Sequence, residues 1–512
     1  MRASRPWATL AVLSAGLFLA VMSTTVVSVA LPTVGRDLHA GPASLEWIVD
    51  AYVLVYASLL VAGGAAGDRY GRKGLFLLGT AIFGLGSLVS ALAPTVGVLL
   101  AGRVLQGAGP ALLVPGSLTI LRAVFTGKRQ RATAIGLWST ASGLALTVGP
   151  PAGGLLVDGL GWRWVFGINV PLAAVLVALA AWLVPRLPRT PAAGRFDWPG
   201  AALVTFALAA LAFATIEGQA RGWAAPVVGV AFAAGAAGVA AFVAAERRRS
   251  GPLIDMSLFR RPAFTVASVA AAAVFFAFVG LIVYLSAWFQ QVQGHSAVRA
   301  GLDVAVVGVA YAAAATWSGR LTARIGERWP LIAGLLIAGA ATLGLLRLEP
   351  ATPASAIWWD LAILGAGIGL SGTPVSAIAM SAVDVPRAGM ASAVVNSMRQ
   401  VGQVFGVAVL GALVYARLPG GAAGARLAPA QATAFTAGLH DALWVCGIVL
   451  LATAVLTALA LARPGAARSR PRSRKRGTGA SLPLDALTRI SLRSSACGTH
   501  SGRTHSRASR RR

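Results

Sequence analysis

Four charged side chains lie within or beside long apolar stretches of this 512-residue sequence: Asp50, Arg103, Asp303 and Asp360. A charge at the centre of a lipid bilayer costs roughly 2.5–3.5 kcal/mol, so residues of this kind are candidates for function. Asp50 and Arg103 lie at similar distances along the chain from the outer ends of their apolar stretches. In helices both would be roughly 8–10 Å deep, where an acid and a base can share one layer.

Such a pair has the composition of a proton-binding site. A neighbouring guanidinium favours the ionised carboxylate, whereas burial favours the protonated acid. A rearrangement that changes the contact between Asp50 and Arg103 would therefore release or take up a proton. We predict that Asp50 is the proton-coupling acid and that Arg103 tunes it, with a static ion pair as the alternative. Asp303 is a further candidate to recognise a cation or carry a proton, unless it is only an acid at a loop edge.

The composition indicates that these residues lie in a membrane protein. Only 12% of the residues are charged and 57% are apolar, with a mean hydropathy of +0.74. A soluble chain is about one quarter charged, so a soluble 52 kDa enzyme is excluded. Fourteen apolar stretches have about the length of a membrane helix. They cover residues 8–30, 45–66, 74–94, 96–119, 132–155, 163–184, 199–217, 223–244, 263–289, 300–318, 329–347, 355–380, 391–415 and 436–462.

The order of these stretches predicts an all-α integral membrane protein in four parts. Residues 1–185 hold six helices, 186–261 two extra helices with basic linkers, 262–462 six helices, and 463–512 a basic tail. Similar short turns of Gly and Arg, at 64–73 and 319–328, would occupy equivalent places in the two six-helix parts. Paired halves around a central site are typical of secondary transporters.

The net charge of +28 is largely a marker of orientation. With the N-terminus in the cytoplasm, inner segments before residue 463 hold 21 Lys and Arg residues and outer loops hold 7. This excess predicts that both termini are cytoplasmic. The tail adds 14 basic residues and one acid, Asp485. We expect it to be disordered and to be attracted to anionic membrane lipid rather than to nucleic acid.

Six short motifs accompany the apolar stretches. They are Thr25-Val-Val-Ser-Val-Ala-Leu-Pro32, Gly64-Ala-Ala-Gly-Asp68-Arg69-Tyr-Gly71-Arg72-Lys73, Arg103-Val-Leu-Gln106-Gly107-Ala-Gly109, Gly149-Pro150-Pro-Ala-Gly153-Gly154, Trp162-Arg163-Trp164-Val-Phe166-Gly-Ile-Asn169-Val-Pro171 and Asn396-Ser-Met-Arg399-Gln400-Val-Gly402. Together they resemble the major facilitator superfamily and, within it, the fourteen-span drug:proton antiporters. The resemblance extends from about residue 10 to 460. It implies the major facilitator fold, with two pseudo-symmetric six-helix bundles, and export driven by protons.

The resemblance also implies roles for two of the motifs. In the loop at 64–73, Gly64 and Gly71 shape the turn, and Asp68 would accept hydrogen bonds from a neighbouring helix N-terminus. The basic residues Arg69, Arg72 and Lys73 would reach carboxylates or carbonyls of the facing half, so that the loop gates the inner side. In the antiporter motif, Gly149, Pro150, Gly153 and Gly154 would allow close helix approach and a kink, although a kink alone is a general feature of membrane helices.

One position departs from the family pattern. The family often has an Asp two residues before the Thr of the first motif, where this sequence has Ser23. The proton-coupling role is therefore assigned to Asp50. Six residues are candidates for the substrate pocket because they are polar or aromatic within the apolar stretches. They are Ser23, Trp138, Tyr284, Asp303, Asn396 and Gln400, of which the last two could instead only bond helix to helix.

Other classes of function have little support in the sequence. Cys446 and Cys497 do not have the spacing of a disulfide framework or a metal site, and the sequence contains no P-loop or HExxH motif. We therefore expect no metal, no cofactor and no enzymatic activity. The sequence predicts a monomeric, proton-coupled transporter in the plasma membrane that exports hydrophobic or cationic drugs or antibiotics by alternating access. The alternatives are a proton symporter for uptake of a small metabolite and a receptor that acts through its tail.

Overall fold

The structure is a computed structural model that describes residues 6–187, 197–249, 254–383, 388–418 and 426–462. In these ranges the chain is helical, apart from turns and short connections. The helices are α1 (Pro6–Asp37), α2 (Pro42–Tyr70), α3 (Arg72–Ala91), α4 (Val96–Val124), α5 (Lys128–Leu160), α6 (Arg163–Gly167), α7 (Asn169–Leu183), α8 (Trp198–Arg221), α9 (Pro226–Arg248), α10 (Pro262–Gln291), α11 (Ala297–Ile325), α12 (Arg328–Gly344), α13 (Ala354–Ser381), α14 (Ala388–Ala416) and α15 (Pro429–Ala462), with short 3-10 turns at Met256–Arg260 and Leu345–Arg347.

The fourteen predicted spans are confirmed among the described residues. Fourteen helical segments are long and apolar enough to cross a membrane, and each coincides with one apolar stretch of the sequence. The sixth span, Arg163–Leu183, is formed by α6 and α7 together. Several helices run beyond the apolar stretch that predicts them, as α1 does to Asp37. A helix continues through polar residues as long as its backbone hydrogen bonds are made, whereas a hydropathy window ends at them.

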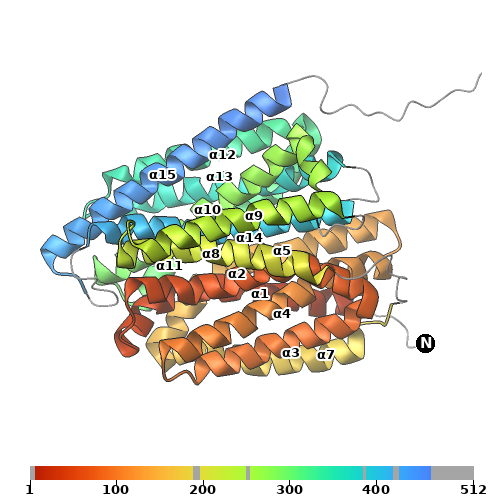
Figure 1. The fold of residues 1–512 in the computed structure, drawn as a ribbon, viewed down its shortest axis with the longest axis horizontal. Helices are drawn as coiled ribbons and strands as arrows, with labels where there is room; N and C mark the ends of the chain where they lie inside the picture. The colour runs from red at the N-terminus through yellow and green to blue at the C-terminus, as the bar shows by residue number, and fades with distance from the viewer. Residues whose placement is uncertain (1–5, 188–196, 250–253, 384–387, 419–425, 463–512) are drawn as a thin grey trace, which may run out of the picture. The chain divides into compact units, whose positions relative to one another are not determined.

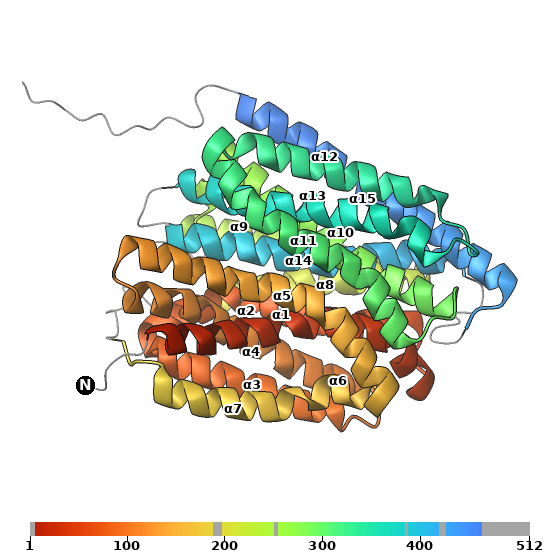
Figure 2. The same cartoon turned by 180° about the vertical axis from the view of Figure 1, so that it is seen from behind.

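The helices form two groups with the same internal packing (Figures 1 and 2). In the first group, α1 packs on α5, α2 on α4, and α3 on α4 and α7. In the second group, α10 packs on α14, α11 on α13, and α12 on α13 and α15. Helix α10 thus takes the place of α1, α11 that of α2, and α14 that of α5. We call α1–α7 the first half and α10–α15 the second half.

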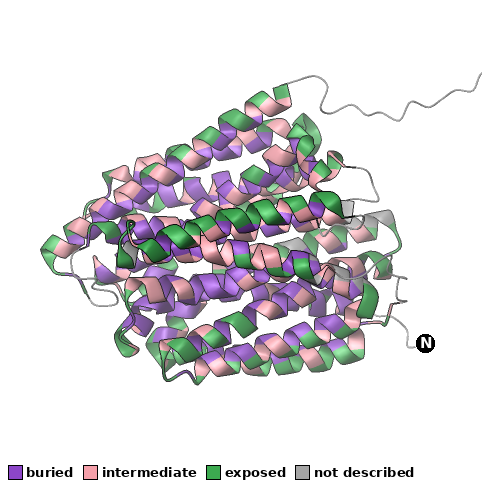
Figure 3. Ribbon diagram, in the orientation of Figure 1, coloured by how far each residue is buried: buried purple, intermediate pink, exposed green. Residues whose placement is uncertain are grey.

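The two halves meet through equivalent helix pairs. Helix α5 packs on α11, and its counterpart α14 packs on α2, while α1 also contacts α10. The remaining helices, α8 and α9, pack on each other, and α8 covers α2 and α14. Exposed residues are most frequent on outlying helices such as α9 (Figure 3). In the most apolar 18-residue window of each span, 22% is buried for Pro226–Arg248 and 78% for Pro262–Gln291. Helix α9 thus has the burial of a lipid-facing helix, and α10 has that of a central helix.

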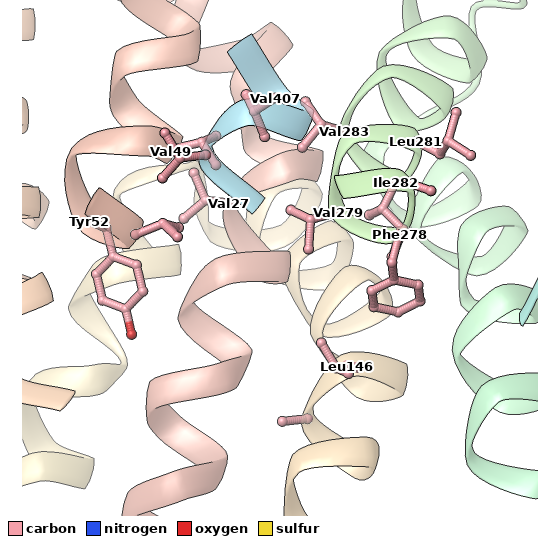
Figure 4. Packing of buried hydrophobic residues seen from close by; sticks show 14 of the residues in the cluster. Val27, Val49, Tyr52, Leu146, Phe278, Val279, Leu281, Ile282, Val283 and Val407 are labelled. Carbon is pink, nitrogen blue, oxygen red and sulfur yellow. The ribbon is translucent and has the colours of Figure 1, made fainter. Parts of the chain in front are cut away.

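Apolar side chains fill the contact between the halves. Val27 on α1 and Val49 on α2 lie close to Val279 and Val283 on α10 and to Val407 on α14 (Figure 4). All five side chains are buried. A polar or charged group in this layer is therefore shielded from water, and movement of one half against the other changes its neighbours.

Candidate functional site

Arg103 on α4 is fully buried and bonded to three neutral acceptors. Its Nε donates to the carbonyl of Ile48 at 2.7 Å, and its Nη1 donates to Gln106 Oε1 at 2.7 Å and to Ser23 Oγ at 3.2 Å. The guanidinium also lies 4.4 Å from the centre of the Tyr52 ring, a distance typical of a cation–π contact. One side chain thus connects α1, α2 and α4 inside the first half.

Asp50 on α2 is also fully buried, but it does not contact Arg103. Neither of its carboxylate oxygens has a hydrogen-bond partner among the described residues. The contact that equal depth suggested is therefore not formed: Nε and Nη1 of Arg103 bond to Ile48, Ser23 and Gln106, and its Nη2 has no partner among the described residues. An ionised carboxylate without partners in an apolar layer is costly, so Asp50 has the environment of a group that binds a proton. Its role in coupling stays a prediction.

Ser23 and Gln106 form the rest of this polar network. Ser23 stands where the resembled family often has an acid, and its hydroxyl accepts a hydrogen bond from Arg103 at 3.2 Å. Gln106, three residues after Arg103, accepts one bond from it and donates another to Ser87 Oγ at 2.8 Å. The role of Gln106 was missed in the sequence, although residues three apart share a helix face.

The antiporter motif lies where α5 passes between α1 and α11. A Cβ on Gly149 would overlap the side chain of Thr25 on α1, and one on Gly153 would lie 2.6 Å from the carbonyl oxygen of Val26. A Cβ on Gly154 would lie 2.6 Å from the Cα of Val298 on α11. These glycines therefore allow α5 to contact a helix of each half.

Pro150 contributes its backbone to the same contact. A Cβ on Gly301 of α11 would overlap the carbonyl of Pro150, so the two helices touch backbone to backbone at this level. At the end of α5, Asp158 accepts hydrogen bonds from the amides of Ala297 at 3.3 Å and Val298 at 2.9 Å. These amides belong to the first turn of α11, so Asp158 caps a helix of the opposite half.

The loop at 64–73 forms the turn between α2 and α3. Gly71 caps the C-terminal end of α2 with φ of 103°, and its amide donates to the carbonyl of Gly67 at 3.1 Å. Lys73 Nζ donates to the carbonyl of Ala181 on α7 at 2.7 Å. Our expectation that Lys73 reaches the facing half is therefore wrong in this structure. Helix α7 runs beside α3 in the same half, and its last carbonyls are within reach of the loop.

The other residues of this loop have local neighbours. A Cβ on Gly64 would lie 3.4 Å from Pro115 Cβ on α4, and the guanidinium of Arg69 lies 5.7 Å from the ring of Tyr70. The Cγ of Arg72 lies 3.6 Å from where a Cβ on Gly67 would be. The side chain of Asp68 lies outside the described residues. The gating role of the loop stays a prediction.

Three of the six pocket candidates are already bonded to other residues. Ser23 bonds to Arg103, as described above. Asp303 accepts hydrogen bonds from His295 at 2.9 Å and from Trp358 at 3.2 Å, near the turn from α10 to α11. Asn396 on α14 accepts one from Arg399 at 3.2 Å. Ser23, Asp303 and Asn396 thus each have hydrogen-bond partners within the protein. None of the three needs a substrate to satisfy its polar group.

The other three candidates are less constrained. Trp138 is 8% exposed, and its indole nitrogen has no partner among the described residues. Gln400 on α14 has an Oε1 that likewise lacks a partner there. Tyr284 on α10 is 2% exposed and lines a cavity between the two halves. The structure thus does not bring the six candidates into one pocket.

The cavity around Tyr284 contains an acid that the sequence analysis missed. Its lining comes from α1, α2, α10 and α14 and consists of Leu31, Pro32, Leu45, Glu46, Val283, Tyr284, Ala287, Gln291 and Tyr415. Glu46 is 3% exposed. It lies one residue inside the start of its apolar stretch, so hydropathy alone does not separate it from a loop acid. Its spacing of four from Asp50 is a signal that both acids share one face of α2.

Comparison with known proteins establishes the family. The family model of the Major Facilitator Superfamily matches residues 13–407. The chain belongs to the Major Facilitator Superfamily. As a superfamily member it is a multi-pass membrane transporter and not an enzyme, as the sequence predicted. The fold of two equivalent six-span groups with two additional helices agrees with this assignment.

Several relatives of this superfamily member are named for resistance to drugs. It is 36% identical to the multidrug resistance protein Stp of Mycobacterium tuberculosis over 403 residues, which are 79% of this chain and 75% of that protein. It is 35% identical to a methylenomycin A resistance protein of Streptomyces coelicolor, over 79% of this chain and 84% of that protein. It is 37% identical to a puromycin resistance protein of Streptomyces alboniger, over 79% of this chain and 81% of that protein.

A solved structure has the same fold as this superfamily member. It is a bacterial homologue of the human lysosomal transporter Spinster, in an inward-facing and occupied conformation. The two structures align with a TM-score of 0.64 at 18% sequence identity, over 88% of this chain and 96% of that one. The likeness confirms the predicted fold.

Replacing Gly154 with Ala is expected to reduce export by this superfamily member. The added methyl group would press on Val298 and force α5 away from α11, and overpacking of this kind costs about 1–3 kcal/mol. Gly159→Ala, on the same helix, is the control, because a Cβ there meets no atom within 4 Å. Dye efflux from cells with matched expression of both variants is the measurement. Equal efflux would contradict a function for close packing at Gly154.

Replacing Gly71 with Ala is expected to destabilise the turn between α2 and α3. Its φ of 103° is strained for any residue with a Cβ, at a cost of about 1–2 kcal/mol. Gly74→Ala is the matched control three residues later, since it lies in α3 and a Cβ there meets no atom within 4 Å. Thermal unfolding of the purified proteins should show a lower midpoint for Gly71→Ala alone. A midpoint equal to that of Gly74→Ala would contradict this reading of the turn.

Proposed function

We propose that this chain exports hydrophobic or cationic drug-like compounds across the plasma membrane, in exchange for protons, by alternating access. The observation that carries the proposal is the likeness, over about four fifths of the chain, to proteins named for antibiotic and multidrug resistance. The tight glycine contact of α5 with α11 supports it, because a rigid contact at one level lets two halves rock about it.

In this proposal Asp50 carries the proton. Its buried carboxylate has no hydrogen-bond partner in the part of the chain that the structure describes, and its helix, α2, packs against α14 of the second half. Rocking of the halves would change the water access of Asp50, and with it the free-energy cost of the charged form. Arg103, held by Ser23, Ile48 and Gln106, would supply a fixed positive charge in the same half.

We also propose the orientation and organisation that the sequence predicts. Both termini would be cytoplasmic, which the threefold excess of basic residues in the inner segments supports. Parts 1–185 and 262–462 would be the moving halves of a monomer, and 186–261 an addition beside them. The tail, 463–512, lies outside the described residues, and we propose that it contacts anionic lipid without a part in transport.

A drug-panel susceptibility assay tests the proposed function. The gene is expressed in a host that lacks its own efflux pumps, and growth is measured with and without a proton uncoupler. Export driven by protons should raise the tolerated concentration of at least one compound, and uncoupling should remove the gain in short-term efflux assays. Increased sensitivity would instead support proton-driven uptake, and efflux that persists without a proton gradient would contradict proton coupling.

A further inference from the structure

A histidine in the turn between α10 and α11 lies between two contacts that join the halves. The residue is His295. Before it in the chain, Gln290 Nε2 on α10 donates to the carbonyl of Val29 on α1 at 3.1 Å. After it, the amide of Val298 on α11 donates to Asp158 on α5 at 2.9 Å. In the proposed orientation this is the outer face, so both bonds hold the halves together on the outer side.

The side chain of His295 is fixed by its neighbours. Its ring stacks on Phe289 of α10, with centroids 5.7 Å apart and planes at 6°. Its Nδ1 lies 2.9 Å from Asp303 Oδ2 on α11, and the other oxygen of that acid accepts a hydrogen bond from Trp358 Nε1 on α13. The side chain of Asp303 is 1% exposed and that of His295 is 25% exposed. The imidazole is therefore the part of the pair that water reaches.

One acid and two bases face His295 from the described residues around this turn. Asp303 contacts it directly, and Arg299 Nε lies 3.6 Å from the same carboxylate oxygen. A Cβ on Gly294, next to the histidine, would lie 3.0 Å from Arg426 Cζ in the segment before α15. Helices α10 and α13 contribute uncharged aromatic rings. Both arginines are exposed, so water screens their charges more than it screens the contact with the buried acid.

Protonation strengthens the bond between His295 and Asp303. A neutral imidazole donates one N–H to a carboxylate, and an added positive charge makes that bond roughly twice as strong. Histidine is the side chain that ordinarily gains a charge between pH 8 and pH 5.5, where ordinary carboxylates stay ionised. The added strength is thus present in acid and is lost as the pH rises.

We propose that protonation of His295 by the outer medium holds the halves closed at this face, with Asp303 as its partner in a pH-sensitive latch. Separation of the halves breaks the bonds on both sides of the turn, and a turn without them holds the imidazole less firmly against the acid. The closed state then binds the proton more tightly, so acid shifts the population toward it. The inference goes beyond the proposed function, because it concerns control of one face and neither the compound nor the coupling acid.

The distance between two spin labels measures closure of this face. One label is attached at Gly159→Cys near the end of α5, and the other at Ala351→Cys in the turn before α13, in a full-length protein that carries Cys446→Ala and Cys497→Ala. A Cβ on Gly159 meets no atom within 4 Å and Ala351 is exposed, so both positions have room for a label. Every sample also carries Asp50→Asn, which removes the titration of the proposed coupling acid.

The ratio of closed to open distances in this labelled protein should rise about fivefold from pH 8 to pH 5.5, the effect of roughly doubling one hydrogen bond. His295→Gln keeps a donor for Asp303 but gains no charge, so its ratio should stay constant. His440→Gln is the matched control. His440 Nε2 lies 2.8 Å from the carbonyl oxygen of Leu348 within the second half, and its loss should leave the rise in place.

Three results would overturn the inference. They are a rise that persists in His295→Gln, a ratio that stays constant in the labelled protein, and a shift toward the open distance in acid. If His295→Gln does not fold, Asp303→Asn takes its place, because it removes the charge that pairs with the imidazolium. A rise that persists in that variant counts against the latch in the same way.

Efflux from cells tests whether the proton comes from the outer medium. The rate of His295→Gln relative to wild type should be higher at an outer pH of 5.5 than at 8, and an equal ratio at both values overturns control from outside. The distances are measured without transport. A pH-dependent latch in a protein that exports nothing therefore means that the proposed function fails while the latch stands. Export with a pH-independent closed population means the reverse.

Discussion

Asp50→Asn is expected to reduce uphill drug export about tenfold or more while leaving the protein folded. Asparagine has nearly the same shape as the acid but cannot exchange a proton at neutral pH, so the coupling step is lost. The neutral amide also removes the cost of an ionised group in the apolar layer. Downhill movement of the compound should survive, because it does not depend on protons. The measurement is dye export by inverted membrane vesicles with an imposed proton gradient.

Asp441→Asn is the control for this experiment. Asp441 is on α15 and pairs with Arg417 at 2.5 Å, where both side chains are partly exposed. Exposed ion pairs contribute about 0–1 kcal/mol, so export should be within about twofold of wild type. Asp50→Glu should restore part of the coupling, because it retains a carboxyl group. A drug gradient built by Asp50→Asn at the wild-type level would show that the coupling acid lies elsewhere.

Arg103→Ala is expected to have the largest effect on stability. The guanidinium is the donor for Ile48, Ser23 and Gln106, and the truncation removes these buried hydrogen bonds inside the first half. Removing the partner of a buried polar group costs about 1–3 kcal/mol, in addition to the lost contact with the Tyr52 ring. The variant should be poorly folded or inactive. Thermal unfolding in detergent and recovery after size-exclusion chromatography are the measurements.

Arg103→Lys separates the charge from the geometry. Lysine keeps the positive charge, but its ammonium is a single point and cannot bond acceptors on three helices as the planar guanidinium does. We expect a folded protein with a lower unfolding midpoint and reduced export. Arg36→Ala is the control, since Arg36 is exposed and, among the described residues, its side chain donates to Thr33 Oγ1 at 3.3 Å on its own helix. Wild-type stability and export in Arg103→Lys would contradict a positioning function for the guanidinium.

Hydropathy predicted the helices of this protein well, because burying a backbone in lipid leaves few alternatives to a helix. Fourteen spans and the equivalence of the two halves are both visible in the chain. The motif glycines were also predictable, since close approach of helices needs a residue without a side chain. Gly153 and Gly154 each have backbone atoms of a neighbouring helix where a Cβ would be.

The partners of the buried charges were not predictable from depth alone. Asp50 and Arg103 lie at similar depths, but depth does not give the rotation of each helix about its axis, and the two side chains do not meet. The partner of Lys73 was not predictable for a similar reason: it depends on which helix end lies next to the loop, and that end belongs to α7. Glu46 was missed because an acid near the end of a span has the sequence signature of a loop residue. Only the packing of α2 against α14, and the cavity lining that α2 shares with α10, show that it is buried.

Dye transport driven by a pH gradient in liposomes tests the central claim most directly. The purified wild-type protein is reconstituted without other proteins, a transported dye such as ethidium is added on one side, and a pH gradient is imposed. We predict that the dye accumulates against its own gradient while protons move in the opposite direction, and that Asp50→Asn only equilibrates it. Dye movement of the same extent with and without the pH gradient would contradict the proton-coupled export proposed for this transporter.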